Sequence, residues 1–437
     1  MQRHVHRCRG VSDKAPALLN EARSWQAAAG RVRVLAPADD PDGFVAFLDA
    51  TRDTRAEPFA PTRMDTLARL SAGLLADPVL RQDPASVSVA YWLRRAQLAR
   101  LAEEHARHAA MEPDVLRVPV GRVLHMAPSN VDTLFLYSWA LAYLCGNASV
   151  VRLSQEQGVI VTALLRVIDS VAAEGGDLRA SNRFVTYGHD DAITTALSEW
   201  CAHRIIWGGD EAVAAIRPLP LPPHASERVF GSKYSFAVID GARFRQAPGQ
   251  EQARVASGFF NDLFWFDQMA CSSPHVVFWI GAPDVVELAA GDLERALQAE
   301  VERRHFKPTV SSAVHRRTYA FGLAASADVR VVLEHPGFVG VHLRDRAALD
   351  KDVCGGGLLR HVPVARLSDV LSFVDEGDQT LTHWGVDGAA LRDFAAQAGA
   401  RGLDRAVPIG EALAFDVVWD GFHLIDDMLR RVRVRGA

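Results

Sequence analysis

The spacing of apolar residues is helical in the first part of the chain. Between residues 42 and 111, apolar side chains recur three or four positions apart, as in Met64, Leu67, Leu70 and Leu74, and Arg and Glu fill many of the positions between them. This period is typical of amphipathic helices that bury one face. We therefore predict that residues 1–111 form a helical N-terminal region that packs on a larger body.

After residue 112 the pattern changes to an alternation of strands and helices. Short β-type runs alternate with longer segments of helical period, and turn residues separate them. Such alternation is typical of a parallel sheet with helices on its faces. Residues 112–233 are predicted to form this first α/β domain, with strands at 118–126, 148–153, 183–187 and 203–207 and helices at 131–145, 159–173, 191–201 and 211–216.

A second α/β domain is predicted over residues 234–400. The Pro-rich segment 218–223 indicates a link between the two domains. Beyond it, we expect strands at 235–239, 275–280, 329–333 and 339–343 and helices at 252–270 and 283–303. Residues 401–437 are expected to return to the first domain or to make oligomer contacts. A chain of 437 residues supports two large domains, because a single core stops growing before that size.

Composition narrows the class of protein. A hydrophobic content of 49%, a charged content of 23% and a net charge of -5 are typical of a soluble globular protein and give no basic face for nucleic acid. The most apolar helix, at 131–145, contains Asp132 and is too short to cross a membrane. Residues 1–10 are basic, but no apolar stretch follows them, so we expect no secretory signal. The chain has five cysteines, which form no CxxC pair and no Cys/His cluster: Cys8, Cys145, Cys201, Cys271 and Cys354. We therefore expect no metal site, and we expect the protein to reside in the reducing cytoplasm.

Cys271 is the strongest candidate for a nucleophile. It lies among small polar residues just before the β-type run 275–280. A thiol at the head of a strand can be approached by a substrate, and its own backbone N–H can help to hold an oxyanion. The alternative is a buried structural cysteine, which is a common role of free Cys. His275, at the start of the strand, is more easily explained by packing than as a base for the thiol.

Two turns follow predicted strands of the first domain. Pro128-Ser129-Asn130 ends the strand at 118–126, and either Ser129 or Asn130 can cap the following helix. Gly208-Gly209-Asp210 leads from a strand into a helix, where backbone N–H groups can receive a phosphate. A plain tight turn explains two glycines equally well.

Together these segments resemble the aldehyde dehydrogenase superfamily and, within it, the fatty acyl-CoA (acyl-protein thioester) reductase family of the bacterial bioluminescence type. The similarity runs from about residue 118 to the C-terminus. It implies that Cys271 is the nucleophile, that the Asn130 amide donates to the oxyanion, and that residues 146–152 contact the adenosine end of a nicotinamide cofactor. The expected cofactor-binding residues are Pro128, Ser129, Arg152, Ser154, Gln155, Gly208, Gly209, Asp210, Phe230 and Gly231.

Two departures from the superfamily pattern refine this expectation. Val229 stands where aldehyde oxidisers carry the Glu that activates water, so an acyl group on Cys271 should persist and meet a hydride. Glu227, two residues earlier, is the alternative base. Arg152 stands where Lys is usual, without the Glu that binds both ribose hydroxyls in NAD-specific relatives, and a guanidinium attracts a 2′-phosphate. NADPH is therefore the favoured cofactor, with NADH as the alternative; Arg152 can also be a solvated charge.

The resemblance implies NADPH-dependent reduction of an acyl thioester to an aldehyde through an acyl-cysteine. It further implies an acyl-CoA or acyl-protein donor, an acyl-transferring partner enzyme as one source of that donor, and a homo-oligomer. One alternative is an NAD(P)-dependent aldehyde dehydrogenase that uses another base. A second is a redox-inactive scaffold that carries acyl groups. The length of the acyl chain is not encoded in any recognisable pattern.

Overall fold

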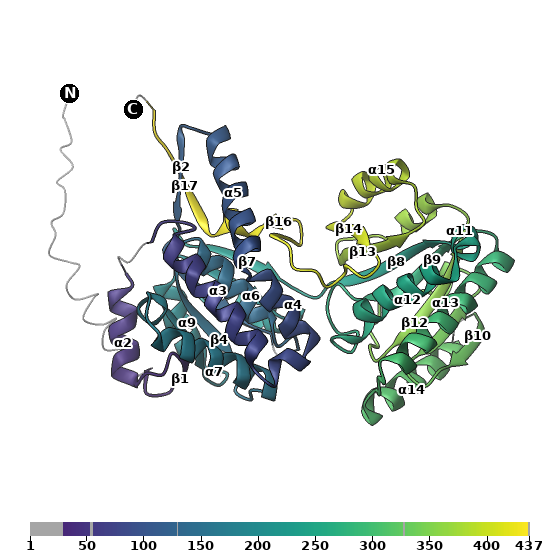
Figure 1. The fold of residues 1–437 in the computed structure, drawn as a ribbon, viewed down its shortest axis with the longest axis horizontal. Helices are drawn as coiled ribbons and strands as arrows, with labels where there is room; N and C mark the ends of the chain where they lie inside the picture. The colour runs from purple at the N-terminus through teal and green to yellow at the C-terminus, as the bar shows by residue number, and fades with distance from the viewer. Residues whose placement is uncertain (1–28, 53–55, 129, 327, 436–437) are drawn as a thin grey trace, which may run out of the picture. The chain divides into compact units, whose positions relative to one another are not determined.

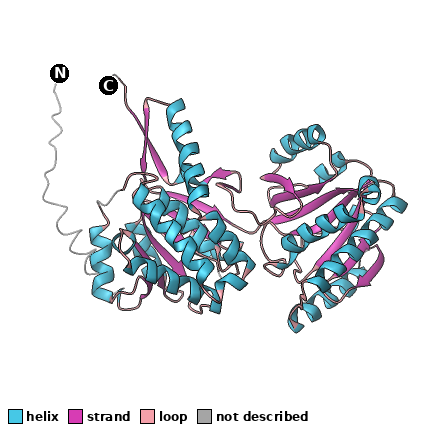
Figure 2. Cartoon of the chain, viewed as in Figure 1, coloured by secondary structure: helices cyan, strands magenta, loops and turns pink. Residues whose placement is uncertain are grey.

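The computed structural model describes residues 29–52, 56–128, 130–326 and 328–435 (Figure 1). The chain forms two compact units. Unit 1 contains the chain up to Gly231 and from Ile425 onward, and unit 2 contains Ser232–Leu424. Each unit has its own sheet with helices on both faces (Figure 2). The predicted α/β class is therefore present in both units.

The sheet of unit 1 has six strands in the order β1-β5-β4-β3-β6-β7. β1 is antiparallel to β5, and the other neighbouring strands are parallel. Two of these strands, β1 and β7, were not predicted from the sequence. The strands are β1 (Arg33–Ala36), β3 (Arg122–Met126), β4 (Ala148–Leu153), β5 (Asn182–Thr186), β6 (His203–Trp207) and β7 (Ser226–Phe230).

The helices of unit 1 cover this sheet. α2 and α9 contribute buried side chains to one core, together with Leu124, Val150 and Ile206 of the sheet. α6 is buried along its whole length, which explains why its sequence is apolar all round. The helical elements are α2 (Pro41–Ala50), α3 (Pro61–Ala76), η2 (Leu80–Gln82), α4 (Pro84–Trp92), α5 (Arg95–Met111), α6 (Leu134–Leu144), α7 (Val159–Ala173), α8 (Leu178–Ser181), α9 (Asp191–Trp200) and α10 (Asp210–Ile216).

The single strand expected at 118–126 is two strands. β2 (Val115–Pro119) leaves the main sheet and pairs with β17 (Leu429–Arg433) in an antiparallel ribbon, while β3 starts at Arg122. Gly121 lies between them with a φ of 113°, a conformation that side chains with a Cβ rarely adopt. The glycine thus lets the chain turn from the ribbon into the sheet.

The sheet of unit 2 has seven strands in the order β10-β11-β12-β9-β8-β13-β14. Only β10 is antiparallel to its neighbour. A separate hairpin consists of β15 (Val418–Trp419) and β16 (Phe422–His423). The sheet strands are β8 (Tyr234–Asp240), β9 (Pro274–Ile280), β10 (Val329–Glu334), β11 (Val339–Leu343), β12 (Leu358–Val364), β13 (Asp378–Trp384) and β14 (Arg405–Pro408).

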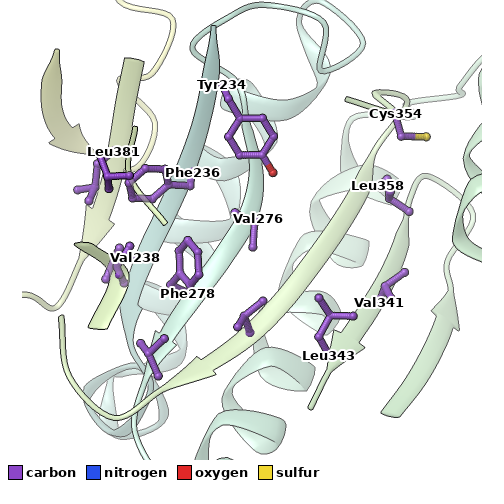
Figure 3. Close-up of a cluster of buried hydrophobic side chains, with 14 of the residues drawn as sticks. Tyr234, Phe236, Val238, Val276, Phe278, Val341, Leu343, Cys354, Leu358 and Leu381 are labelled. Atoms are coloured by element: carbon purple, nitrogen blue, oxygen red, sulfur yellow. The ribbon is translucent and has the colours of Figure 1, made fainter. Parts of the chain in front are cut away.

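Both faces of this sheet are buried, because alternate residues of each strand enter different cores. Phe236 and Phe278 lie in one core (Figure 3), and Ala237 and Trp279 lie in the other, against α12 and α13. The helical elements of unit 2 are α11 (Gly241–Gln246), α12 (Gly249–Phe264), α13 (Pro283–Arg303), α14 (Val310–Ser326), η3 (Arg346–Ala348), η4 (Leu367–Ser372) and α15 (Gly388–Gly399), and α16 (Leu424–Asp427) leads back to unit 1.

The boundaries between the units differ from the expected ones. The Pro-rich segment 218–223 joins α10 to β7 inside unit 1, and the chain leaves that unit after Gly231. Residues 401–424 stay in unit 2, because β14 extends its sheet and the buried Asp262 carboxylate accepts hydrogen bonds from the N–H groups of Gly410 and Ala412. The chain returns to unit 1 at Ile425. Within the described residues, every helix is too short or too polar to span a bilayer.

Candidate functional site

The candidate cofactor residues of unit 1 lie at one edge of its sheet. β3, β4, β6 and β7 are parallel, so their carboxyl ends share an edge. Pro128 and Asn130 follow β3, Arg152 lies near the end of β4, and Gly208 and Gly231 follow β6 and β7. This edge is where open α/β sheets bind their ligands. The structure thus brings together residues that the sequence separates widely.

Arg152 has unused hydrogen-bonding capacity at this edge. Its guanidinium lies 5.5 Å from the centroid of the Tyr187 ring and donates to the Tyr187 carbonyl at 3.4 Å. Its buried Nε has no hydrogen-bond partner among the described residues. Burying an unsatisfied donor is unfavourable, so an anionic ligand here would be stabilised.

The other residues after β4 are polar and accessible. Ser154 donates to the Glu156 carbonyl at 2.6 Å, and Gln155 is exposed beside Gly188. Asn130 is exposed as well. The expected cap is wrong, because α6 starts after Thr133 without a side-chain cap. Ser129 lies outside the described residues.

The Gly-Gly turn differs from a phosphate-binding loop in its charge. Gly209 is the N-cap of α10, whose first turn carries Asp210 and Glu211. These carboxylates already interact favourably with the helix N-terminus and repel a phosphate. The Asp210 carboxylate also approaches Gly231, since a Cβ there would come within 2.8 Å of Oδ1. Phe230 is buried against Trp207 at a ring distance of 3.8 Å, so it belongs to the core.

The two candidates for a base in β7 have structural surroundings. Val229 packs against the core that contains α9. The carboxylate of Glu227 accepts a hydrogen bond of 2.7 Å from Arg204, a buried residue, and lies 3.5 Å from Arg217. The Glu227 carboxylate thus pairs with two guanidinium groups. Glu227 is therefore accounted for as the partner of a buried arginine.

In unit 2, Cys271 lies on a loop after α12. This loop includes the last residues of the helix that was expected at 252–270. α12 ends at Phe264, because Asp267 and Gln268 adopt positive φ angles of 51° and 61°. Gln268 is fully buried and donates to the carbonyls of Pro274 and Leu358 at 2.8 and 2.9 Å, while its oxygen accepts from the Gly357 N–H at 3.0 Å. These bonds fix the loop to the starts of β9 and β12.

The Cys271 thiol is the accessible one among the described cysteines. Cys145, Cys201 and Cys354 are buried, whereas Cys271 is partly exposed. Burial of its surroundings and the charge of Asp420 raise the pKa of the Cys271 thiol, and the backbone N–H groups of Lys233 and Cys271 oppose this shift. The Cys271 carbonyl accepts a hydrogen bond of 2.7 Å from the Ser235 hydroxyl. The surroundings of the loop therefore favour the protonated thiol over the thiolate.

Four polar residues around this thiol were not singled out from the sequence. β9, β8, β13 and β14 are adjacent and parallel, so their amino ends share an edge. Lys233, Gln379 and Asp404 lie at the starts of β8, β13 and β14, and Gln379 donates to Asp420 at 2.6 Å. The Asp-Gly pair at 420–421 was the available signal, and it indicates a turn rather than a site.

A second polar cluster that sequence patterns did not reveal is buried under α13. Glu294 accepts from His335 at 3.0 Å and from His342 at 2.9 Å, and His361 Nε2 lies 3.2 Å from its carboxylate. Glu294, His342 and His361 are spaced as metal ligands would be. However, Trp279 Nε1–H donates to His361 Nδ1 at 3.0 Å. An indole only donates, so a neutral His361 carries its proton on Nε2, the atom that would have to bind a metal.

The chain matches the family model described as acyl-CoA reductase (LuxC) over residues 97–431. Among curated relatives, it is 27% identical over 184 residues to long-chain acyl-protein thioester reductase 2 of Photobacterium leiognathi, covering 42% of this chain and 36% of the relative. It is 30% identical over 184 residues to the long-chain acyl-protein thioester reductase of Aliivibrio fischeri, covering 41% and 36%. The match thus spans little more than a third of these relatives.

A solved structure shows the same fold. The indole-3-acetaldehyde dehydrogenase complexed with NAD+ superposes with a TM-score of 0.63 at 14% identity, covering 94% of this chain and 88% of the other. The expected aldehyde dehydrogenase-like α/β fold is therefore confirmed. Because the family model covers most of the chain, the expected family is confirmed too: the chain belongs to the acyl-CoA reductase (LuxC) family.

Proposed function

We propose that this protein reduces an acyl thioester to an aldehyde through an acyl group on Cys271. The observation that carries the proposal is the partly exposed thiol of Cys271, held on a braced loop at the edge of the unit 2 sheet. The family and the printed names of the curated relatives support the same chemistry.

The residues of the chain act in two half-reactions. In the first, the Cys271 sulfur attacks the thioester carbon, a new C–S bond forms, and the donor thiol leaves with the proton that Cys271 gave up. The Cys271 N–H stabilises the oxyanion, and one such donor typically contributes about 3 kcal/mol. The Asn130 amide is the second donor that the family resemblance implies. In the second half-reaction, the acyl carbon on Cys271 is reduced, and a nicotinamide cofactor, when bound, would supply the hydride. The C–S bond then breaks, and the aldehyde leaves the Cys271 thiolate, which takes up a proton.

NADPH is the proposed cofactor. Arg152 provides the supporting observation, because its buried Nε is unpartnered among the described residues at the ligand-binding edge of unit 1. A charge-assisted hydrogen bond to a 2′-phosphate would satisfy it. NADH lacks that phosphate and would gain nothing from Arg152.

The test is intact-protein mass spectrometry. Exposure to an acyl-CoA or an acyl-protein without cofactor should add one acyl mass to the protein, and NADPH should then remove it and yield an aldehyde. Cys271→Ala should show no adduct, whereas Cys354→Ala, which changes a buried thiol of the same unit, should retain it. Formation of free acid from the adduct, or an adduct that survives in Cys271→Ala, contradicts the proposal.

Aldehyde oxidation is the second candidate function. Asp420 is the observation that favours it, since a carboxylate whose charge acts on Cys271 can activate water as well as take a proton. An oxidiser would convert aldehyde and NADP+ to free acid faster than it reduces a thioester. Comparing the two rates in one preparation distinguishes the functions.

The proposed donor is an acyl-CoA or an acyl-protein, and an acyl-transferring partner enzyme is one source of it. Comparing adduct formation from coenzyme A and protein donors of the same acyl chain length decides between them.

We also propose that the chain forms a homo-oligomer. The ribbon of β2 and β17 supports this, because Leu116 and Val432 pair across it and are both exposed.

A further inference from the structure

The thiol of Cys271 has to lose a proton before it can attack. Burial and the nearby charge of Asp420 raise its pKa, so the thiol is protonated near neutral pH. His275 is unsuited to be the base. It is buried beside Tyr234, with ring centroids 5.2 Å apart, and burial lowers its pKa to about 3. The proton acceptor is therefore another group at this edge of the sheet.

Asp420 is placed near this thiol by a series of short contacts. Ser235 donates to the Cys271 carbonyl at 2.7 Å and accepts from the Thr380 N–H at 3.1 Å, which ties the nucleophile loop to β13. Gln379, the residue before Thr380, donates to Asp420 Oδ1 at 2.6 Å. Asp420 has a φ of 47° at the turn of the hairpin formed by β15 and β16. Gln379 thus positions the carboxylate of Asp420.

The charges around Asp420 change the pKa of its carboxyl group. Burial raises the pKa of Asp420 to about 6, and Asp404 adds to this rise, whereas Gln379, Lys233 and Arg405 lower it. Lys233 Nζ lies 3.3 Å from Asp404 Oδ2, so its charge is shared between two carboxylates. A carboxylate that titrates near the working pH is the most effective kind of proton-transfer group.

We propose that Asp420 takes the proton of Cys271 and delivers it to the departing thiol, with Gln379 as its positioning residue. This inference rests on the proposed function. The balance is complete: the S–H bond of Cys271 breaks, an O–H bond forms on Asp420, the donor thiolate leaves as the sulfur attacks, and that thiolate takes the proton from Asp420. After hydride transfer, the Cys271 thiolate regains a proton from solvent. Each turnover therefore consumes one solvent proton.

The test is the pH dependence of adduct formation in the full chain, followed by intact mass in a quenched reaction without cofactor. The wild-type rate should rise through pH about 6 and then level off, because the ionised Asp420 is the active form. Asp420→Asn should lose this rise and acylate about 100-fold more slowly at pH 7. Gln379→Met should move the rise to higher pH, and Asp404→Asn should move it to lower pH.

Alkylation of Cys271 by iodoacetamide provides the matched readout. The charge of Asp420 raises the pKa of Cys271, so Asp420→Asn should be alkylated faster than wild type although it acylates more slowly. Faster acylation together with faster alkylation would reduce Asp420 to an electrostatic neighbour and overturn the inference. An adduct that forms at the wild-type rate in Asp420→Asn but lasts longer would overturn it too, because Asp420 would then activate water. Absence of any adduct in wild type contradicts the proposed function instead.

Discussion

Single buried polar side chains hold the loop of Cys271 in place. The amide of Gln268 is fully buried and fully used, with two bonds donated to strand ends and one accepted from Gly357. Asp267, beside it, accepts from the Ser312 hydroxyl at 2.5 Å and from the Gly356 N–H at 2.9 Å. These two residues have left-handed backbone conformations, and their hydrogen bonds hold the loop of Cys271 in a fixed position. The loop therefore depends on residues that take no part in the proposed reaction.

Gln268→Met should lower both stability and reactivity. Methionine has a similar length but leaves two carbonyls and one N–H buried without partners, at a cost of about 2–4 kcal/mol. Thermal unfolding should report the loss, and adduct formation at Cys271 should slow because the loop loses these hydrogen bonds. Gln252→Met, which removes a single bond of 2.8 Å to the Phe244 carbonyl, is the control and should cost less. Equal losses in the two variants would contradict this account of the loop.

Glu294→Gln should destabilise unit 2 in a pH-dependent way. Burial opposes ionisation of Glu294, but the hydrogen bonds from His335, His342 and His361 overcome it and hold its pKa far below the usual value. A depressed carboxyl pKa stabilises the folded state above the unfolded pKa of about 4.5, and this stabilisation is lost as pH falls below it. The variant should lose about 3 kcal/mol at pH 7, because it leaves donors facing an amide in the core.

Urea denaturation at pH 7 and pH 4 measures this effect. The difference between wild type and Glu294→Gln should shrink at the lower pH, where the wild-type carboxylate begins to lose its advantage. A metal chelator should not change the difference, since the Trp279 indole keeps the His361 proton on the atom that faces Glu294. A wild-type unfolding midpoint that falls on chelation would show a bound metal instead.

Arg152→Gln should weaken NADPH binding and spare NADH. Loss of one charge-assisted hydrogen bond typically costs about 1.5–3 kcal/mol, so the Kd for NADPH should rise about 10-fold to 100-fold. Titration of tryptophan fluorescence with each nucleotide measures this without turnover. Arg166→Gln, which changes an exposed arginine of α7, is the control and should leave both affinities unchanged. A similar rise for NADH would assign Arg152 a structural role.

At the scale of elements, the sequence predicts the limits of a helix best where one hydrophobic periodicity continues without interruption between residues that end a helix. α7 and α13 have the expected limits, because both are long and strongly periodic. β1 was missed because it has only four residues and lies at the sheet edge. The helix predicted up to residue 270 was wrong, because apolar spacing does not reveal the backbone conformations of Asp267 and Gln268. The sequence did not indicate the proposed role of Asp420 for a similar reason, since that role depends on a contact with a distant strand.

The ribbon of β2 and β17 provides a prediction about assembly. Leu116 and Val432 pair across it with 54% and 40% of their surfaces exposed, a costly arrangement unless another surface covers them. Leu116→Lys should therefore lower the mass measured by light scattering toward that of the monomer. Leu288→Lys, at an equally exposed position on α13, is the control and should leave the mass unchanged. An unchanged mass in Leu116→Lys would remove the ribbon from the interface.

At the scale of the whole molecule, the residues from Ile425 onward complete unit 1. Asp427 pairs with Arg228 through two contacts of 2.7 Å, and Asp426 lies 3.0 Å from Arg117. The Met428 carbonyl accepts from the Asn147 amide at 3.0 Å and from the Val120 N–H at 3.1 Å. The last segment thus joins β2, β4 and β7 of a unit that the chain left after Gly231. Unit 2 is a continuous insertion between these two parts.

Removal of residues 425–437 should therefore damage unit 1 and spare unit 2. The deletion leaves β2 without its partner, exposes the Cys145 side of α6, and removes the Asp426 and Asp427 partners of Arg117 and Arg228. Hydrogen exchange should speed up in β2 and at the start of β4, while β8 and β9 keep their protection because their two cores contain no residue of the deleted segment. Asp427→Asn, which removes one ion pair alone, should give a smaller change confined to unit 1. Faster exchange in β8 and β9 of the deletion variant would show that the two units unfold as one.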